Sequence, residues 1–406
     1  MHPTQSGVSP RLLSTIYALN FFRIGYQTVA IAWFATQKTG RTSSVAEILL
    51  IVSVATLCLS PLMGYLVDAI PRKRMLLCVA HSVIVLCGIT VGVAGYFIPG
   101  VPTFSVLAFM AVALAGASLL GGGAMDYFLR ETIANGLRTR RIASLNMVAQ
   151  ISLIAGTAAA GCAASLMTIG TAFLTLSVCS GINTILCRLH LPDLRILKTT
   201  EVLKTGFCLG NAFLYLQFPA LFLIACCSAL AFSVGQITNT LLPGLIAISL
   251  KLGSLSYSTI EAVWAVGALS ASAYLAMKHK ACAGRSHVDL FTICAMAIVL
   301  VAIPFASAVS ELITIHFLLG IGFAFVRVRS ESRFLNECPV HFLGRIRANS
   351  MALSSIVGLA IYCIPLVSED ASISSLYLVF GTMVFSTGVI LLIASAEWRR
   401  TPAKDQ

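Results

Sequence analysis

The chain has 406 residues, of which 58% are hydrophobic and only 10% charged, and its mean hydropathy is +0.93. Soluble globular domains carry roughly 25% charged residues, so this composition excludes a soluble enzyme, a disordered scaffold and a secreted disulfide-rich module. A net charge of +12 would suggest nucleic-acid binding in a soluble protein. The positions of the basic residues therefore decide how that charge is interpreted.

Apolar stretches long enough to cross a bilayer follow one another along the whole chain, separated by short polar segments. They cover residues 13–36, 45–67, 75–97, 103–125, 144–168, 170–189, 219–247, 257–277, 288–308, 311–330, 349–367 and 372–395. We therefore predict an all-α membrane protein with twelve transmembrane helices.

The basic residues predict the orientation of these spans. If the N-terminus is cytoplasmic, 23 of the 27 Lys and Arg residues fall in cytoplasmic segments, and the largest group is five arginines between residues 327 and 347. This distribution follows the positive-inside rule. We expect a multi-pass protein of the bacterial cytoplasmic (inner) membrane, with both termini cytoplasmic and a first span that is retained rather than cleaved. The charge is then a topology signal, and no nucleic-acid partner is expected.

The longest polar break, residues 191–218, is basic at first and then amphipathic, which predicts a cytoplasmic loop with a short helix on the membrane surface. It separates an N-terminal half (1–190) from a C-terminal half (219–406), each with six spans. Arg141-Ile142 recurs as Arg345-Ile346 at an offset of 204 residues. The two halves are therefore interpreted as an internal duplication.

Ionisable residues inside spans are costly and are the default functional candidates. In span one, Arg23 and Gln27 lie one turn apart on the same face. Arg23 could contact an anionic cargo, or it could instead reach the cytoplasmic surface or pair with Asp126. In span four, Asp126 and Arg130 are spaced to pair along one helix face, which allows either a proton pathway or a structural role.

The C-terminal half offers a second group of candidates. Glu261 in span eight has no basic residue within a helical turn and could carry protons, or it could reach the outer interface. His316 in span ten could titrate or simply pack. Gln236 and Asn239 share one face of span seven, and Trp264 in span eight could stack on a flat ligand or be packed. All five are candidates for the substrate or proton pathway.

Span five carries small residues four positions apart, at Gly156, Ala160 and Ala164. Such a stripe lets two helix backbones approach closely. We predict a close helix crossing there.

Two six-span halves with cytoplasmic termini and a basic central loop resemble the major facilitator superfamily of transporters. The resemblance is most specific in the segment GYLVDAIPRKR at residues 64–74, between spans two and three. Its matches to the family signature are Gly64, Asp68, Arg72 and Lys73, whereas Ala69 and Pro71 depart from it. The resemblance implies a gating motif in which Asp68 faces a helix N-terminus and the basic residues hold acids of span four, namely Asp126 and Glu131.

Two further segments, residues 29–40 and 339–346, are similar to the branch that holds the enterobactin exporter and macrolide-efflux permeases. This similarity implies a proton-coupled permease, an antiporter that exports a siderophore-like or amphiphilic small molecule by alternating access. The expected partners are that substrate, protons and the lipid bilayer, and the protein is expected to be a monomer.

Two alternatives stay open: an importer of a metal–chelator complex or small nutrient, and a transporter-like sensor or partner protein. Gly121-Gly122-Gly123 lies in an apolar span without the Lys-Ser or Lys-Thr of a phosphate-binding loop. The seven histidines show no metal-ligand spacing. We therefore expect no enzyme activity, no cofactor and no metal site.

Overall fold

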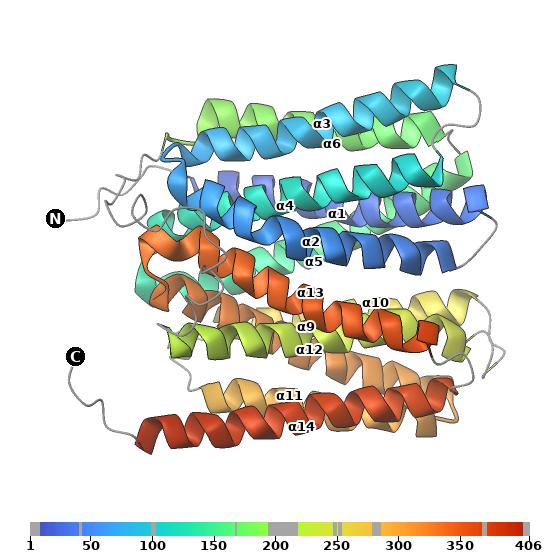
Figure 1. The fold of residues 1–406 in the computed structure, drawn as a ribbon, viewed down its shortest axis with the longest axis vertical. Coiled ribbons are helices and arrows are strands. Elements are labelled where there is room, and N and C mark those ends of the chain that lie inside the picture. Colours follow the sequence, from blue (N-terminus) through green and yellow to red (C-terminus); the bar gives the residue numbers. More distant parts are fainter. Residues whose placement is uncertain are drawn as a thin grey trace. The chain divides into compact units, whose positions relative to one another are not determined.

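The computed structural model describes residues 9–39, 43–98, 103–166, 169–193, 218–246, 250, 254–277, 286–367 and 372–400. This part of the chain is helical and contains no strand, so the predicted all-α class is confirmed. The helices are α1 (Pro10–Thr39), α2 (Ser43–Ala69), α3 (Lys73–Phe97), α4 (Phe104–Thr132), α5 (Arg138–Leu166), α6 (Ile169–His190), α9 (Pro219–Gly244), α10 (Ser254–Met277), α11 (Ser286–Ala302), α12 (Val309–Glu337), α13 (Leu343–Val367) and α14 (Ile373–Arg400) (Figure 1).

Each of the twelve predicted spans corresponds to one of these helices. Ten of the helices are apolar and long enough to cross a membrane by length and composition. The remaining two are α1 and α10, and α10 carries the shorter apolar stretch Ala262–Met277. Most of the predicted central loop, residues 194–217, lies outside the described residues.

Several helices begin at residues that are suited to a helix N-terminus. The Thr103 hydroxyl accepts a hydrogen bond from the Val106 N–H (3.4 Å) and caps α4. Pro219 stands at the start of α9, where its missing N–H costs nothing. The Glu311 carboxylate in the first turn of α12 accepts from the N–H groups of Ser307 (2.7 Å) and Ala308 (3.3 Å). These local signals fix where the apolar helices start.

The chain forms two compact units. One consists of Met1–Asn135, Met147–Leu214 and Cys338–Ser355, and the other of Gly136–Asn146, Tyr215–Glu337 and Ile356–Gln406. Two helices are therefore shared: α5 begins in the second unit and continues in the first, whereas α13 begins in the first and continues in the second.

In the first unit, α3 packs against α6 and α4, α2 packs against α4, and α1 packs against α6. Leu107, Leu114 and Phe173 are fully buried in its core. Large apolar side chains point outward, and Phe109 is 74% exposed. An apolar exterior around an apolar core is what a lipid environment allows.

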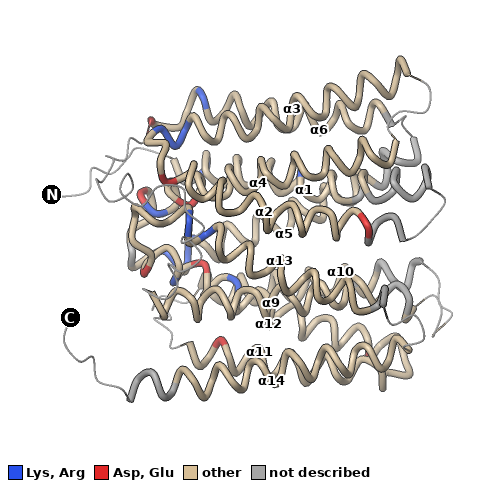
Figure 2. Tube along the Cα trace, viewed as in Figure 1, with Lys and Arg blue, Asp and Glu red and all other residues tan. Residues whose placement is uncertain are grey.

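In the second unit, α10 packs closely on α12, α11 packs on α14 and α12, and α9 packs on α12. The crossing of α10 and α12 depends on two glycines. A Cβ on Gly267 would overlap the Phe317 carbonyl oxygen, and one on Gly320 would overlap that of Trp264. Within each unit taken by itself, most of the described charged residues lie at one end of the helices (Figure 2).

Candidate functional site

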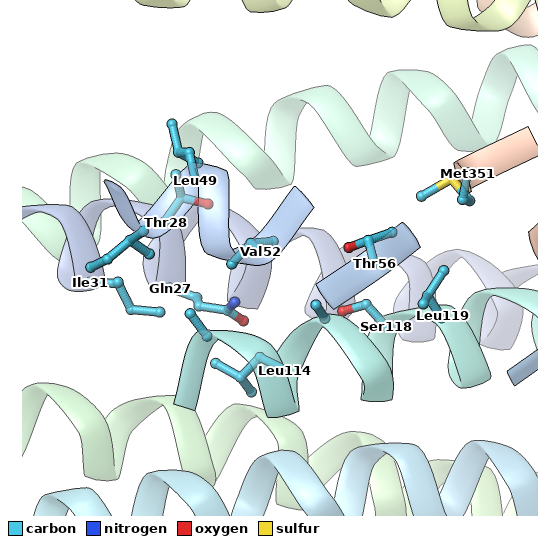
Figure 3. Close-up of a pocket in the computed structure, with 13 residues that line it drawn as sticks. Gln27, Thr28, Ile31, Leu49, Val52, Thr56, Leu114, Ser118, Leu119 and Met351 are labelled. Carbon is cyan, nitrogen blue, oxygen red and sulfur yellow. The ribbon is translucent and has the colours of Figure 1, made fainter. Parts of the chain in front are cut away.

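A cavity of about 330 Å³ lies inside the first unit, between α1, α2 and α4, with one side chain from the start of α13 (Figure 3). Most of its lining is aliphatic. Its residues are Gln27, Thr28, Ile31, Ile48, Leu49, Val52, Thr56, Ala111, Leu114, Ala115, Ser118, Leu119 and Met351. Four of these are polar and uncharged, and none of the described lining residues is ionisable. A cavity of this kind suits an uncharged ligand with a few hydrogen-bonding groups.

Gln27 is the candidate from span one that lines this cavity, and its side chain reaches from α1 toward Leu114 of α4 (Figure 3). Its carbonyl oxygen accepts a hydrogen bond from Arg23 Nη1 (2.5 Å). The other terminal nitrogen, Arg23 Nη2, donates to the Asn20 carbonyl oxygen (3.0 Å). Arg23 is thus held by two amides of its own helix.

Arg23 itself does not line the cavity. Its side chain is buried, and the nearby titratable groups are Cys179 of α6 and His81 of α3. The alternative that Arg23 reaches the cytoplasmic surface does not hold, because the residue is only 2% exposed. The second alternative, a pair with Asp126, is not what the structure shows, since Asp126 pairs with Arg347.

A buried polar cluster surrounds Asp68 at the end of α2. Its carboxylate accepts hydrogen bonds from the Gly344 N–H (2.6 Å), the Arg345 N–H (3.0 Å) and the Tyr127 hydroxyl (2.9 Å). Arg345 Nε lies 3.4 Å from the carboxylate, and both side chains are at most 1% exposed. Asp68 therefore binds the N-terminal end of α13 through backbone donors, as its position in the motif implied.

Two glycines allow this approach. A Cβ on Gly64 would come within 2.7 Å of the Ala348 Cβ, and a Cβ on Gly344 would come within 2.7 Å of Asp68 Oδ1. Both distances are shorter than real Cβ contacts. The Gly at position 64 of the motif is thus required by packing, because the start of α13 lies directly against α2.

The basic residues of the motif divide into two roles. Lys73 is fully buried, donates to the carbonyl oxygens of Val67 and Ile70 (2.9 Å to Ile70), and lies over the Tyr127 ring (4.1 Å). It therefore closes the C-terminal end of α2, where a cation is favourable. Arg72 is exposed, so it is outside this cluster.

Asp126 of α4 forms an ion pair with Arg347, whose Nε and Nη2 donate to its two carboxylate oxygens (2.5 and 2.9 Å). Such two-point contacts are the strongest geometry for this pair. Arg130, the partner expected from helical spacing, donates to the Cys338 carbonyl oxygen. Burial raises the pKa of the Cys338 thiol, so this thiol stays protonated. Glu131, the other acid expected to hold the motif, is exposed.

The candidates in the second unit are not brought into one site. Gln236 packs against Gly358 of α13, and Asn239 is exposed. His316 is buried, its Nδ1 lies 2.9 Å from the Leu312 carbonyl oxygen, and its ring lies 6.4 Å from that of Trp264. The side chain of Glu261 lies outside the described residues.

The second unit contains an ion pair that was not predicted from the sequence. Arg329 was expected in a cytoplasmic segment, but α12 continues to Glu337 and buries this residue. Arg329 Nε lies 2.5 Å from Asp289 of α11, and Arg333 Nη1 lies 3.4 Å from the same carboxylate. The assignment of basic residues to loops does not reveal this pair, because Asp289 and Arg329 lie 40 residues apart in the sequence.

The chain is similar in sequence and in fold to known membrane proteins. The family model of the Major Facilitator Superfamily matches residues 13–345. The chain belongs to this superfamily. As a Major Facilitator Superfamily protein it is a multi-pass membrane protein and a transporter rather than an enzyme. No curated protein matches it significantly.

Solved structures of the superfamily share the fold at low sequence identity. A bacterial homologue of the iron transporter ferroportin, in an outward-facing state, is 14% identical with a TM-score of 0.76, covering 97% of this chain and 99% of that one. The human organic anion transporter MFSD10 is 13% identical (TM-score 0.72; 94% and 98% covered). The proton:xylose symporter XylE is 13% identical (TM-score 0.70; 95% and 94% covered). Among the described residues of this chain, no group of three or more His, Cys, Asp or Glu side chains could hold a metal ion.

Proposed function

We propose that this superfamily member exports an uncharged amphiphilic small molecule across the bacterial inner membrane in exchange for protons. The observation that carries the proposal is the lining of the cavity: thirteen described residues, mostly aliphatic, with four neutral polar side chains. Burying a charge without a partner is costly. Of the two cargo classes considered, amphiphilic and siderophore-like, this lining favours the uncharged amphiphile over an anionic chelator.

The Asp68 cluster and the Asp126–Arg347 pair are proposed as the gate. Both attach the start of α13 to α2 and α4. Protonation of Asp126 would remove its charge and release Arg347, so that proton binding and gate opening would be linked. The twelve helices would then act as two six-helix halves, residues 1–190 and 219–406, that alternate access to the cavity.

The orientation follows from the basic residues. We place both termini in the cytoplasm, because the great majority of Lys and Arg then lie on the cytoplasmic side. The cavity lies within one chain, and we propose a monomer as the working unit.

Uptake by energised inside-out membrane vesicles tests the proposal. Radiolabelled chloramphenicol and progesterone represent uncharged amphiphiles, and 2,3-dihydroxybenzoate represents an anionic catechol. We expect the first two to accumulate in vesicles that contain the protein and the third not to. Ala115→Phe, which fills the cavity, should abolish accumulation, whereas Phe109→Ala on the outer face of α4 should leave it unchanged. Accumulation of only the catechol, or uptake unaffected by Ala115→Phe, would contradict the proposal.

A further inference from the structure

Arg23 restricts how Gln27 can present its amide to the cavity. The two residues are one helical turn apart on α1, and Arg23 Nη1 lies 2.5 Å from the Gln27 side-chain oxygen. A guanidinium has only donors, so the atom that faces it must be the carbonyl oxygen of the amide. The orientation of the Gln27 amide therefore follows from chemistry and is not a free choice between two flips.

Within the part of the chain that the structure describes, only the oxygen of the Gln27 amide has a hydrogen-bond partner. Gln27 lines the cavity, and among the described residues its Nε2 makes no hydrogen bond. Because Arg23 fixes the oxygen on its own side of the amide, the two N–H donors of the NH2 group remain for a ligand in the cavity. The neighbouring Thr28 hydroxyl donates to the Ile24 carbonyl oxygen (2.9 Å), so its own proton is already used.

Arg23 is held firmly enough to impose this orientation. It is 2% exposed, and its second terminal nitrogen is bound to Asn20 (3.0 Å). The guanidinium thus bridges the side-chain amides of Asn20 and Gln27, which lie on the same face of α1. It cannot turn toward the cavity without giving up both contacts.

We propose that Arg23 is a positioning residue that fixes Gln27 as a hydrogen-bond donor, so that the cavity selects uncharged ligands carrying a hydrogen-bond acceptor such as a ketone, ester or amide carbonyl. The inference deepens the proposed function, because it rests on this cavity being the substrate site. A ligand without an acceptor would displace water from Gln27 and leave the amide N–H groups unpaired. Unpaired donors in a site that normally hydrogen-bonds its ligand lower the affinity for such a ligand.

Three compounds of one carbon skeleton test the inference: menthone has an acceptor only, menthol has a donor and an acceptor, and menthane has neither. Their binding to the purified full-length protein in detergent is measured by isothermal titration calorimetry. The wild type should bind menthone about tenfold more tightly than menthane, which corresponds to one net hydrogen bond.

Gln27→Glu is the decisive variant. The carboxylate can still accept from Arg23, so the contact within α1 is retained, but it has no donor to offer. Its preference for menthone over menthane should disappear, and menthol should now bind more tightly than menthone. Arg23→Met, which frees the amide to flip, should reduce the preference to about twofold, and Arg23→Lys should retain most of it. Arg11→Met, at an exposed position of the same helix, serves as control.

Equal binding of menthone and menthane by the wild type, or an unchanged preference in Gln27→Glu, would overturn the inference. So would a failure of all three compounds to bind up to their solubility limits. If chloramphenicol uptake stays sensitive to Ala115→Phe in such a case, the proposed function stands while the role of Arg23 falls. If the wild type shows no preference for menthone and chloramphenicol uptake is also insensitive to Ala115→Phe, the cavity is not the substrate site.

Discussion

Asp68 shows how a single carboxylate can be buried at the end of a transmembrane helix. Its charge is balanced by three hydrogen-bond donors from Tyr127, Gly344 and Arg345, together with the Arg345 guanidinium at 3.4 Å. Donors to the charged form offset the desolvation that burial imposes. The same contacts join α2, α4 and the start of α13.

Asp68→Asn should destabilise the protein strongly. The amide retains one acceptor and directs its NH2 group at backbone N–H donors, while Arg345 loses its counter-charge in a site that is at most 1% exposed. Breaking a buried pair from one side costs about 3–5 kcal/mol. Tyr127→Phe is the matched control. The hydroxyl has one proton, which the Asp68 carboxylate (2.9 Å) and the Val340 carbonyl oxygen (2.6 Å) share, so its loss should cost only about 1 kcal/mol.

The free energy of unfolding of the purified protein, from denaturant titration, gives both numbers. Similar losses in the two variants would show that Asp68 is not the centre of this cluster.

Some of these residues could be predicted from sequence, and others could not. Gly64, Asp68 and Lys73 lie within one recognisable segment, residues 64–74, and Arg23 and Gln27 share a helix face by their spacing. Their partners gave no comparable signal: Asp68 and Arg345 lie 277 residues apart, and Asp126 and Arg347 lie 221 apart. Thr56 and Ser118 line the cavity, but single small hydroxyl residues in apolar helices are too common to mark a site.

The helices themselves follow from the sequence, because each apolar stretch must form all its backbone hydrogen bonds internally. Their boundaries were less predictable. The span predicted over 311–330 corresponds to the longer helix Val309–Glu337. Its charged end can remain helical because Arg329 and Arg333 both contact Asp289. Similarly, α13 begins at Leu343 rather than at the predicted residue 349, because the additional residues 343–348 bind Asp68 and Asp126. Hydropathy alone does not detect such paired ends.

The crossing of α1 and α5 depends on glycine. A Cβ on Gly25 would overlap the Leu153 carbonyl oxygen, and one on Gly156 would overlap that of Phe22. Gly156 begins the stripe of small residues in span five, where a close helix crossing was predicted. In a bilayer, where apolar side chains gain little by leaving lipid, close backbone contact of this kind is what holds helices together.

Gly156→Val should force α1 and α5 apart and destabilise the protein by about 1–3 kcal/mol, the usual cost of overpacking. Gly122→Ala on α4 is the control, because nothing lies within 4 Å of its added Cβ. Relief of the glycine penalty within a helix should make that variant neutral or more stable by up to about 1 kcal/mol. Thermal unfolding of both purified variants measures the difference, and an unaffected Gly156→Val would refute the close crossing.

At the scale of the whole molecule, the notable feature is the exchange of helix starts between the two units. Residues 338–355 belong to the first unit and residues 136–146 to the second, so α5 and α13 each contribute to both. The charged contacts proposed as a gate, Asp68 with Arg345 and Asp126 with Arg347, lie where α13 enters the first unit. In the second unit, the start of α5 is held by Arg138, which donates to the Leu335 carbonyl oxygen (2.9 Å) and to Asn336 Oδ1 (2.6 Å), and by Asn146, which donates to Ser272 of α10 (2.7 Å). Buried polar contacts therefore hold the start of both helices.

Proton binding at Asp126 is proposed to be coupled to cargo movement. The direct test is proton flux in proteoliposomes, followed with trapped pyranine at a clamped membrane potential while chloramphenicol is added outside. We expect the wild type to move protons when the compound is added, Asp126→Asn to show no such flux, and Glu131→Gln, an exposed acid on the same helix, to behave as the wild type. Chloramphenicol transport without proton movement, or equal proton flux in Asp126→Asn, would contradict the claim.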